Sequence, residues 1–288
     1  MSKGVKDSNS TDEKIEKIEK NKYNKLIQFS FYITFIFLTT TGTITLIEAL
    51  RTPDTCVRHI MNLETCISFT ASYFYYNFIS KINEYNKENK QIVCRRCGVA
   101  HVAETQNSEV DKGDTRVCRR CGVADVAETR NSEVFDEKVW EEFTLIRYFD
   151  WSITTPFMLL SLCLFLGYNV HIPLKIYTII PIWILNYIML YFGFLGEIGN
   201  IGRLTACIAG FIPFIIIMYI IFITFIKGKK NVANNLLFIL YFIIWSLYGI
   251  VYLFSHEYKN IITNILDLIS KCLIGLGMWA YYVKIISF

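Results

Sequence analysis

The most constraining feature of this sequence is a set of seven long apolar runs that contain almost no charged residues. A helix needs about 20 mostly apolar residues to cross ~30 Å of hydrocarbon. Each run meets that length and is bounded by charged residues or by Gly and Asn clusters. We therefore predict an all-α membrane protein, a bundle of seven transmembrane helices over Ile27–Leu50, Ile60–Ser80, Phe143–Tyr168, Pro173–Leu195, Leu204–Ile226, Val232–Ser255 and Ile261–Val283.

The composition agrees with this fold class and excludes others. Hydrophobic residues make up 53% of the chain and charged residues only 19%, whereas soluble domains carry about 25% charged residues. The net charge of +4 is spread over tails and loops, without the basic stripe that nucleic-acid binding requires. We therefore expect a lipid bilayer as the surroundings, no nucleic-acid partner and no enzymatic activity.

The charged residues also divide the chain. Residues 1–26 form a polar tail, and residues 27–288 form the helical domain, which a long polar segment interrupts at 83–142. The tail lacks the apolar core of a cleavable signal peptide, so we expect the first helix to direct insertion. The breaks after the first, third and fifth helices hold six Lys and Arg, against two in the breaks after the fourth and sixth. The positive-inside rule then places the N-terminus outside.

Ionisable residues inside the predicted helices are the best indicators of function, because they are costly in hydrocarbon. Lys271 lies about ten residues into the seventh helix, and Asp267 precedes it by four, on the same face. Arg147 and Asp150 begin a stripe with 3–4 spacing on the third helix, which continues through Thr154 and Ser161. A buried lysine amine can form a Schiff base with an aldehyde, and a protonated Schiff base needs a nearby anion. The two carboxylates and two cations sum to zero charge.

Two segments carry a resemblance to a known family. The stretch RYFDWSITTP at 147–156 resembles the third-helix signature of microbial, or type 1, rhodopsins, and LDLISK at 266–271 resembles their retinal-lysine signature. Helix six adds WSLY at 245–248. The resemblance covers all seven runs and leaves only the tail and the inserted segment outside. It implies the seven-helix bundle of the microbial rhodopsin type and an all-trans retinal bound covalently as a Schiff base at Lys271.

The resemblance also implies roles for single residues. Asp150 would be the primary counterion and proton acceptor, Asp267 the second counterion, and Arg147 a gated arginine on the outer side. Helix five offers Phe211 or Phe214 where relatives have tryptophan, and Gly249 stands where many have proline. The retinal pocket would be lined by Trp151, Thr155, Met189, Gly193, Phe214, Trp245, Tyr248, Tyr252 and Ser270.

Departures from the family pattern bear on the transported ion. Ser161 stands where outward proton pumps usually have a carboxylate that reprotonates the Schiff base, and a hydroxyl does not replace it. Glu257 matches one carboxylate of the family's proton-release pair, but Lys259 replaces its partner. The triplet Asp150, Thr154 and Ser161 is similar to that of the rhodopsins of giant algal viruses. That group is associated with light-gated cation conduction, and outward proton pumping has also been proposed for it.

Glu64 adds a carboxylate to the second helix, either as part of a cation path or as a neutral, hydrogen-bonded group. Further polar groups for such a path between helices one, two, three and seven are Ser30, Asn62, Asn260, Asn264 and Glu257. We predict a retinal-binding photoreceptor that moves cations in response to light, as a light-gated channel. The alternatives are an outward proton pump and, third, a photosensor without transport. The resemblance also implies retinal, protons and small cations as partners and a small homo-oligomer.

The inserted segment holds a tandem repeat. The sequence VCRRCGVAHVAETQNSEV from Val93 recurs with two changes from Val117, at a period of 24 residues. Its four cysteines form two C-x-x-C pairs, Cys94 with Cys97 and Cys118 with Cys121, a spacing that fits tetrahedral zinc. Duplication of one segment produces the same spacing without selection for a metal. Zinc, disulfides and a disordered repeat expansion therefore remain three open interpretations.

Overall fold

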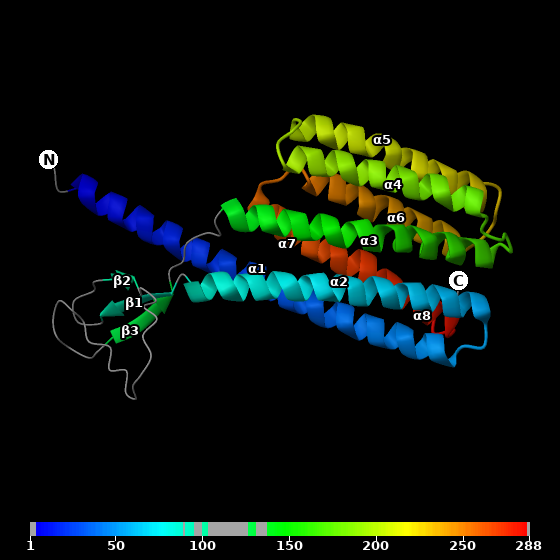
Figure 1. Ribbon diagram of the computed structural model, residues 1–288, viewed down its shortest axis with the longest axis horizontal. Coiled ribbons are helices and arrows are strands. Elements are labelled where there is room, and N and C mark those ends of the chain that lie inside the picture. Colours follow the sequence, from blue (N-terminus) through cyan, green and yellow to red (C-terminus); the bar gives the residue numbers. More distant parts are fainter. Residues whose placement is uncertain (1–3, 89, 95–99, 103–125, 131–136, 287–288) are drawn as a thin grey trace, which may run out of the picture. The chain divides into compact units, whose positions relative to one another are not determined.

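The computed structural model describes residues 4–88, 90–94, 100–102, 126–130 and 137–286, with side chains described over 25–85, 139–255 and 258–286. The chain divides into two units, Met1–Lys25 with Ile79–Val134, and Leu26–Phe78 with Phe135–Phe288. The second unit is called the bundle below (Figure 1).

The helices are α1 (Gly4–Arg51), α2 (Thr55–Glu88), α3 (Glu137–Asn169), α4 (Ile176–Glu197), α5 (Arg203–Ile221) with the π-helical η1 (Phe222–Ile226), α6 (Val232–Val251), and α7 (His256–Asp267) continued by the π-helical η2 (Leu268–Leu273) and α8 (Ile274–Tyr282).

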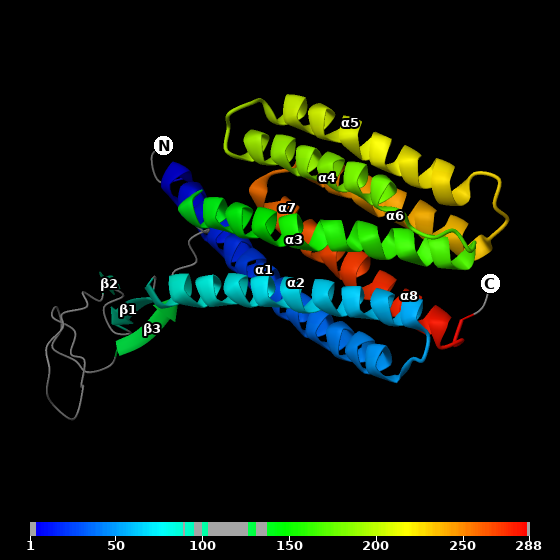
Figure 2. The same ribbon diagram turned by 45° about the vertical axis from the view of Figure 1, so that its right-hand side comes forward.

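The helices of the bundle run side by side, and α4 and α5 are neighbours in both ribbon views (Figures 1 and 2). The end at which α4 and α6 finish and α5 and α7 begin is called the N-terminal end of the bundle. The opposite end, at which α8 finishes, is called the C-terminal end. Lys271 lies between the two ends, in the irregular segment η2. Single π-helical turns inside α-helices are frequent at functional sites.

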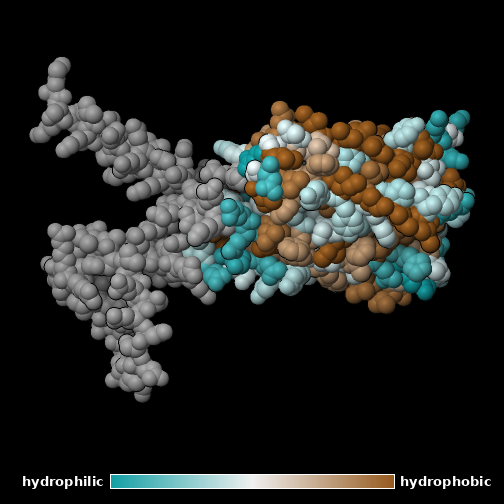
Figure 3. Space-filling model, turned by 45° about the horizontal axis from the view of Figure 1, so that its top comes forward, coloured by the Kyte–Doolittle hydropathy of each residue, from teal (hydrophilic) through white to brown (hydrophobic). Residues whose placement is uncertain are grey.

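The apolar surface of the bundle matches a membrane environment. Six helical stretches are long and apolar enough to span a bilayer, at 25–51, 139–169, 176–197, 203–226, 232–251 and 258–282. The remaining long helix, α2, is not among these six stretches, because Glu64 and many hydroxyl side chains lower its mean hydropathy. Figure 3 shows hydrophobic residues over much of the lateral face, with hydrophilic residues gathered toward the ends. Large apolar side chains on α4, such as Ile184 and Tyr191, are exposed.

Prolines inside three helices are compatible with this packing. Pro156, Pro181 and Pro213 lie within α3, α4 and α5. Each removes one backbone donor, and in membrane helices the freed carbonyls find other partners. The indole Nε1 of Trp183 on α4 donates to the carbonyl oxygen of Pro156 at 3.0 Å, which ties α4 to α3 next to the cavity described below.

Several predicted boundaries are wrong. The fourth helix begins at Ile176 rather than Pro173, since Lys175 has an extended backbone. The sixth helix ends at Val251 rather than Ser255, and the seventh begins at His256 rather than Ile261. The inserted segment predicted at 83–142 is shorter, because α2 continues to Glu88 and α3 begins at Glu137. Polar residues continue α2, α3 and α7 beyond their apolar parts, so an apolar window underestimates the length of these three helices.

The unit that contains the inserted segment has strands that the sequence pattern did not predict. Strands β1 (Lys90–Cys94), β2 (Ala100–Val102) and β3 (Val126–Arg130) form an antiparallel sheet in the order β2-β1-β3. Ile92 on β1 pairs with His101 on β2 and with Glu128 on β3. Each repeat therefore contributes to pairing with β1, one through Ala100–Val102 and the other through Val126–Arg130.

Candidate functional site

A buried lysine contacts two carboxylates in the middle of the bundle. The Nζ atom of Lys271 donates to Asp150 Oδ2 at 2.6 Å and to Asp267 Oδ2 at 3.5 Å. All three side chains are at most 2% exposed. Arg147 Nη1 lies 3.7 Å from Asp267 Oδ2, so the four charges that the sequence pattern placed on two helices lie together. Buried charges are tolerated when they are paired in this way.

Two tyrosines hold Asp267 in place. The Tyr75 hydroxyl donates to Asp267 Oδ2 at 2.9 Å, and the Tyr248 hydroxyl donates to Asp267 Oδ1 at 2.5 Å. The Tyr248 oxygen also lies 3.0 Å from Ser270 Oγ. Sequence reasoning identified Tyr248 and Ser270 but missed Tyr75. Asp150 has a different environment, because its Oδ1 has no hydrogen-bond partner among the described side chains and backbone groups.

Arg147 leads from this cluster toward the N-terminal end of the bundle. Its Nη2 donates to Asn264 Oδ1 at 2.5 Å, and its Nε donates to Asn260 Oδ1 at 3.2 Å. Asn264 Nδ2 in turn donates to Ser30 Oγ on α1 at 2.8 Å. The guanidinium also lies over the Phe78 ring, 5.1 Å from its centre, a cation–π contact. Three of the residues predicted for an ion path thus join one hydrogen-bonded network.

Toward the C-terminal end, the buried polar groups among the described side chains are neutral hydroxyls and amides apart from one acid, Glu64. Ser161 Oγ donates to Glu64 Oε1 at 2.5 Å, and Glu64 is 2% exposed. Thr154 is fully buried and donates to the backbone carbonyl of Asp150 at 2.8 Å. Asn62, which the sequence pattern placed on the same path, is exposed on α2. The side chain of Glu257 lies outside the described residues, so its predicted place on the path stays a prediction.

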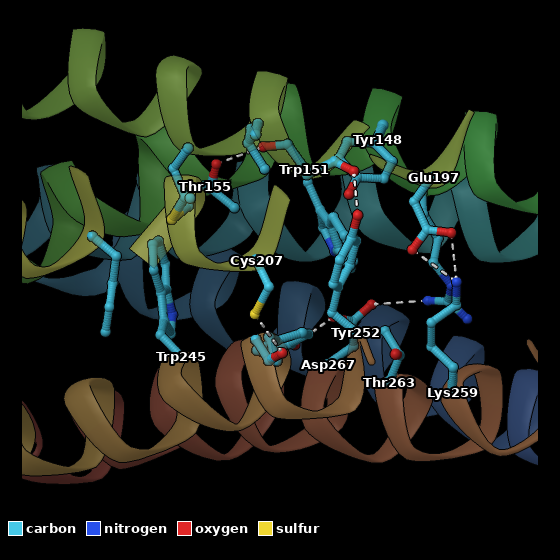
Figure 4. Close-up of a pocket in the computed structure, with 18 of the residues that line it drawn as sticks. Tyr148, Trp151, Thr155, Glu197, Cys207, Trp245, Tyr252, Lys259, Thr263 and Asp267 are labelled. Atoms are coloured by element: carbon cyan, nitrogen blue, oxygen red, sulfur yellow. Dashed lines mark hydrogen bonds and ion pairs between the residues drawn. The ribbon is translucent and has the colours of Figure 1, made fainter. Parts of the chain in front are cut away.

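An elongated cavity runs beside the charge cluster (Figure 4). The rings of Trp151 and Tyr248 meet edge to face, with centroids 5.8 Å apart. Gly193 leaves room for the Tyr148 hydroxyl, which would lie 2.6 Å from a Cβ at that position. Asn186 Nδ2 donates to Thr155 Oγ1 at 2.8 Å, which fixes the position of Thr155 in the cavity wall. All the residues predicted for the retinal pocket line this cavity: Trp151, Thr155, Met189, Gly193, Phe214, Trp245, Tyr248, Tyr252, Ser270 and Lys271.

These walls fit retinal. Aromatic faces suit a flat, rigid, apolar molecule, and a few polar groups at one side fix its orientation. The amine of Lys271 lies on that side, next to Asp150 and Asp267. Attachment at Lys271 would place the linkage between the lysine and its two carboxylates, where a positive charge is stabilised.

An ion pair that the sequence pattern did not predict lies at the N-terminal end of this cavity. Lys259 Nζ donates to both carboxylate oxygens of Glu197, at 2.8 and 2.7 Å. Both residues belong to the cavity wall. Sequence reasoning compared Lys259 with Glu257 nearby in the chain. Its partner in the structure is Glu197 on α4, 62 positions away.

The predicted metal site lies outside what the structure describes. Cys97, Cys118 and Cys121 have no described position, and Cys94 is described only by its backbone in β1. Zinc and disulfides at these residues therefore stay predictions. Among the described residues, no group of three or more His, Cys, Asp or Glu side chains is placed to hold a metal ion.

The fold and this site define a class. A seven-helix bundle whose last helix carries a buried lysine between two carboxylates, beside an aromatic cavity, is the arrangement of a microbial rhodopsin. A family model described as "Bacteriorhodopsin-like protein" matches residues 25–285. The chain belongs to this family, and the predicted fold class is confirmed. Membership implies an integral multi-pass membrane protein with a retinal chromophore.

Solved structures agree with the assignment. The viral rhodopsin OLPVRII is 36% identical, with 91% of this chain and 100% of that chain covered and a TM-score of 0.68. The structure of Acetabularia rhodopsin I is 18% identical over 91% of this chain and 95% of that chain, with a TM-score of 0.61. Xanthorhodopsin, described as a light-driven ion pump with dual chromophore, is 18% identical over 90% and 92%, with a TM-score of 0.61. The last two show the fold alone. A search of curated proteins gave no match.

Proposed function

We propose that this protein is a retinal-binding photoreceptor that moves cations across a membrane in response to light, as a light-gated cation channel. The observation that carries the proposal is a series of buried or half-buried polar side chains from α1, α2, α3 and α7 that extends to both sides of Lys271. It includes Ser30, Glu64, Ser161, Asn260 and Asn264 in addition to the charge cluster. Polar residues inside a membrane bundle mark ion pathways.

Retinal, when bound at Lys271, supplies light absorption and a change of shape. The chain supplies the proton chemistry around it. Asp150 Oδ2 lies 2.6 Å from Lys271 Nζ, within reach of direct proton transfer. Asp267 is the second counterion, held by hydrogen bonds from Tyr75 and Tyr248. Transfer of a proton from the Lys271 nitrogen to Asp150 would neutralise both groups and leave Arg147 and Asp267 as the remaining charged pair.

The loss of charge at Asp150 affects the ion path through Arg147. Arg147 donates to Asn260 and Asn264, and Asn264 donates to Ser30 on α1. A shift of the guanidinium therefore changes hydrogen bonds between α1, α3 and α7 together. We propose that this rearrangement admits water and cations between these helices and α2. Buried polar networks of this kind have a few discrete arrangements, which suits a switch.

A second candidate is an outward proton pump, and one contact favours it. Ser161 occupies the position of the usual donor carboxylate, and its hydroxyl donates to Glu64 at 2.5 Å. Glu64 has no described cation partner and is 2% exposed, a setting that favours the neutral, protonated acid. Glu64 could thus supply a proton through Ser161.

Orientation and assembly complete the proposal. The C-terminal end of the bundle faces the inside in our proposal, because its loops hold most of the short-loop Lys and Arg residues. A small homo-oligomer is supported by the exposed apolar faces of α4 and α5, which carry residues such as Ile184, Tyr191, Ile208 and Ile212.

Voltage-clamp recording from cells that express the protein with retinal tests the proposal. A light-evoked current that reverses sign, at a potential that follows the cation gradient, is the expected result for a channel. An outward current that never reverses would overturn the channel and support the pump. A pigment that forms but gives no current at any voltage would contradict both the channel and the pump.

A further inference from the structure

The ion pair between Glu197 and Lys259 lies at one end of the retinal cavity and has no role in the function proposed above. The Glu197 side chain is 3% exposed and that of Lys259 is 12% exposed. Glu197 is the last residue of α4, and Lys259 lies in the first turn of α7. The two helices are separated in the chain by α5 and α6, so the contact ties together distant parts of the bundle. A bidentate contact of this kind also fixes the geometry of both side chains.

The pair belongs to the same cavity as Lys271. Figure 4 shows it at one end of the cavity, with Trp245 at the other end and Tyr252 and Asp267 between them. Tyr252 closes part of the wall there, because its hydroxyl donates to the carbonyl oxygen of Gly193 at 3.0 Å. Lys259 is itself part of the wall at this end and is partly exposed, so movement of its side chain would open the cavity there.

The energetics of buried charges suggest why this contact matters. Two opposite charges that leave water together compensate each other, whereas removal of one partner leaves a desolvated charge. An unpaired charge draws water in or turns outward to reach it. Either response would hydrate the end of the cavity. The intact pair therefore favours a closed state.

We propose that the Glu197–Lys259 ion pair closes the retinal cavity at the N-terminal end of the bundle and sets how fast water and small polar molecules reach Lys271. The inference rests on the proposed attachment of retinal to that lysine. The pair is a positioning element: it holds the ends of α4 and α7 together and excludes water without touching the attachment point.

The test uses the full chain reconstituted with retinal and kept in the dark with hydroxylamine, which cleaves the imine between retinal and lysine. The rate at which the visible absorption disappears measures access to Lys271. Glu197→Gln, which keeps the shape of the side chain, and Lys259→Met should each bleach at least about tenfold faster, which corresponds to about 1.4 kcal/mol in the free energy of opening. The exchanged pair, Glu197→Lys with Lys259→Glu, should return to within about twofold of the parent rate.

A matched control removes a lysine at the other end of α4. Lys175 is exposed, so Lys175→Met removes one positive charge, as Lys259→Met does, and should leave the bleaching rate unchanged. Unchanged rates in both single variants would overturn the closure. If the variant with the exchanged pair also bleaches fast, the ion pair is not the cause of the closure.

A second measurement needs no retinal. Cys207 lines the same cavity and is partly buried. In retinal-free protein, a small water-soluble thiol reagent should modify Cys207 faster in Glu197→Gln than in the parent, as read by mass spectrometry of the peptide that contains it. Equal rates would refute the closure. A parent chain that forms no pigment with retinal would instead refute the proposed function, so the two failures are distinguishable.

Discussion

The two halves of the bundle, on either side of Lys271, differ in how their polar groups are satisfied. Toward the N-terminal end, Arg147, Asp267 and Asn264 each have several partners, and the Glu197–Lys259 pair lies beyond them. Toward the C-terminal end, the contact between Ser161 and Glu64 involves a buried acid, and other contacts there join neutral groups, such as Asn169 with Asn234. One half, called the network half, connects charged groups and amides, and the other, called the dry half, holds one buried acid among apolar and neutral side chains.

This difference indicates where control of transport lies. A connected network of charges and amides holds its members in place, and after a rearrangement it can offer successive sites to water or to a cation. An apolar stretch with one acid resists both, so passage there depends on Glu64. The network half should therefore set chromophore attachment and stability, and the dry half should set current. The predictions below separate these two contributions.

The largest effect should come from Lys271→Ala, which removes the amine that lies between the two carboxylates. Retinal then has no attachment point, so we expect a chain that inserts and purifies without colour. Absorption spectra after addition of retinal measure this. Lys175→Ala, an equal truncation at an exposed position, should keep full colour. A coloured Lys271→Ala variant would place the attachment elsewhere.

Glu64→Gln probes the dry half. The amide can still accept from Ser161 but carries neither a charge nor a transferable proton. We expect photocurrent to fall by about tenfold, equivalent to about 1.4 kcal/mol in the barrier, with little change in the absorption maximum. Glu48→Gln, near the end of α1, is the control and should leave the current intact.

The same variant sharpens the choice between channel and pump. If Glu64 reprotonates the site, Glu64→Gln should slow the return to the dark state by about 100-fold, the usual contribution of a positioned proton donor. Flash photolysis measures that return. A reduced current with an unchanged return rate favours the channel. Normal current and normal recovery would remove Glu64 from the path.

Tyr75→Phe probes the network half. It removes the hydroxyl that donates to Asp267 and Asn264, and hydrogen bonds to charged groups contribute about 1.5–3 kcal/mol. We expect the pigment to lose its colour at a lower temperature, with photocurrent less affected than in Glu64→Gln. Tyr73→Phe is the matched control, because Tyr73 is 62% exposed on the same helix. Equal thermal stability in both variants would contradict the role of Tyr75.

The sequence was sufficient for the fold and for the charge cluster, for a physical reason. Helical spacing alone places Arg147, Asp150 and Ser161 on one face of α3, and a spacing of four places Asp267 beside Lys271. Hydrocarbon then forces such charges inward, toward one another. The charged residues of α3 and α7 are therefore expected to lie together even when the exact packing of the helices is unknown.

Other contacts depend on helix rotation and on distant partners. Tyr73, Tyr75 and Tyr76 follow closely in the chain, and only the rotation of α2 decides that Tyr75 is the buried one. The pairing of Lys259 with Glu197 requires the relative height of α4 and α7. The rotation of α2 also leaves Asn62 exposed, two residues from the buried Glu64. No local pattern in a single sequence contains that information.

The smallest effect should come from the loop at the C-terminal end of the bundle, where Asp54 caps α2. Its Oδ1 accepts from the backbone N–H groups of Cys56 and Val57 at 2.8 and 3.0 Å, and its Oδ2 accepts from the Tyr168 hydroxyl at 2.9 Å. Asp54→Ala should lower the free energy of unfolding by about 1 kcal/mol, the usual value of such a cap. The temperature at which the pigment bleaches measures this.

The pH dependence identifies the carboxylate as the cause. The backbone N–H of Val57, together with the Tyr168 hydroxyl and the N–H of Cys56, holds the pKa of Asp54 below its ordinary value. A group whose pKa is lower in the folded state stabilises that state above the unfolded pKa and loses the contribution as the pH falls through the folded pKa. The difference in the free energy of unfolding between the parent and Asp54→Ala should therefore shrink in acid.

Asp54→Asn is the control, because it keeps an acceptor for the backbone but has no titrating charge. The difference in stability between Asp54→Asn and Asp54→Ala should therefore not depend on pH. A parent-to-Ala difference that stays constant in acid would assign the stabilisation to packing rather than to the carboxylate.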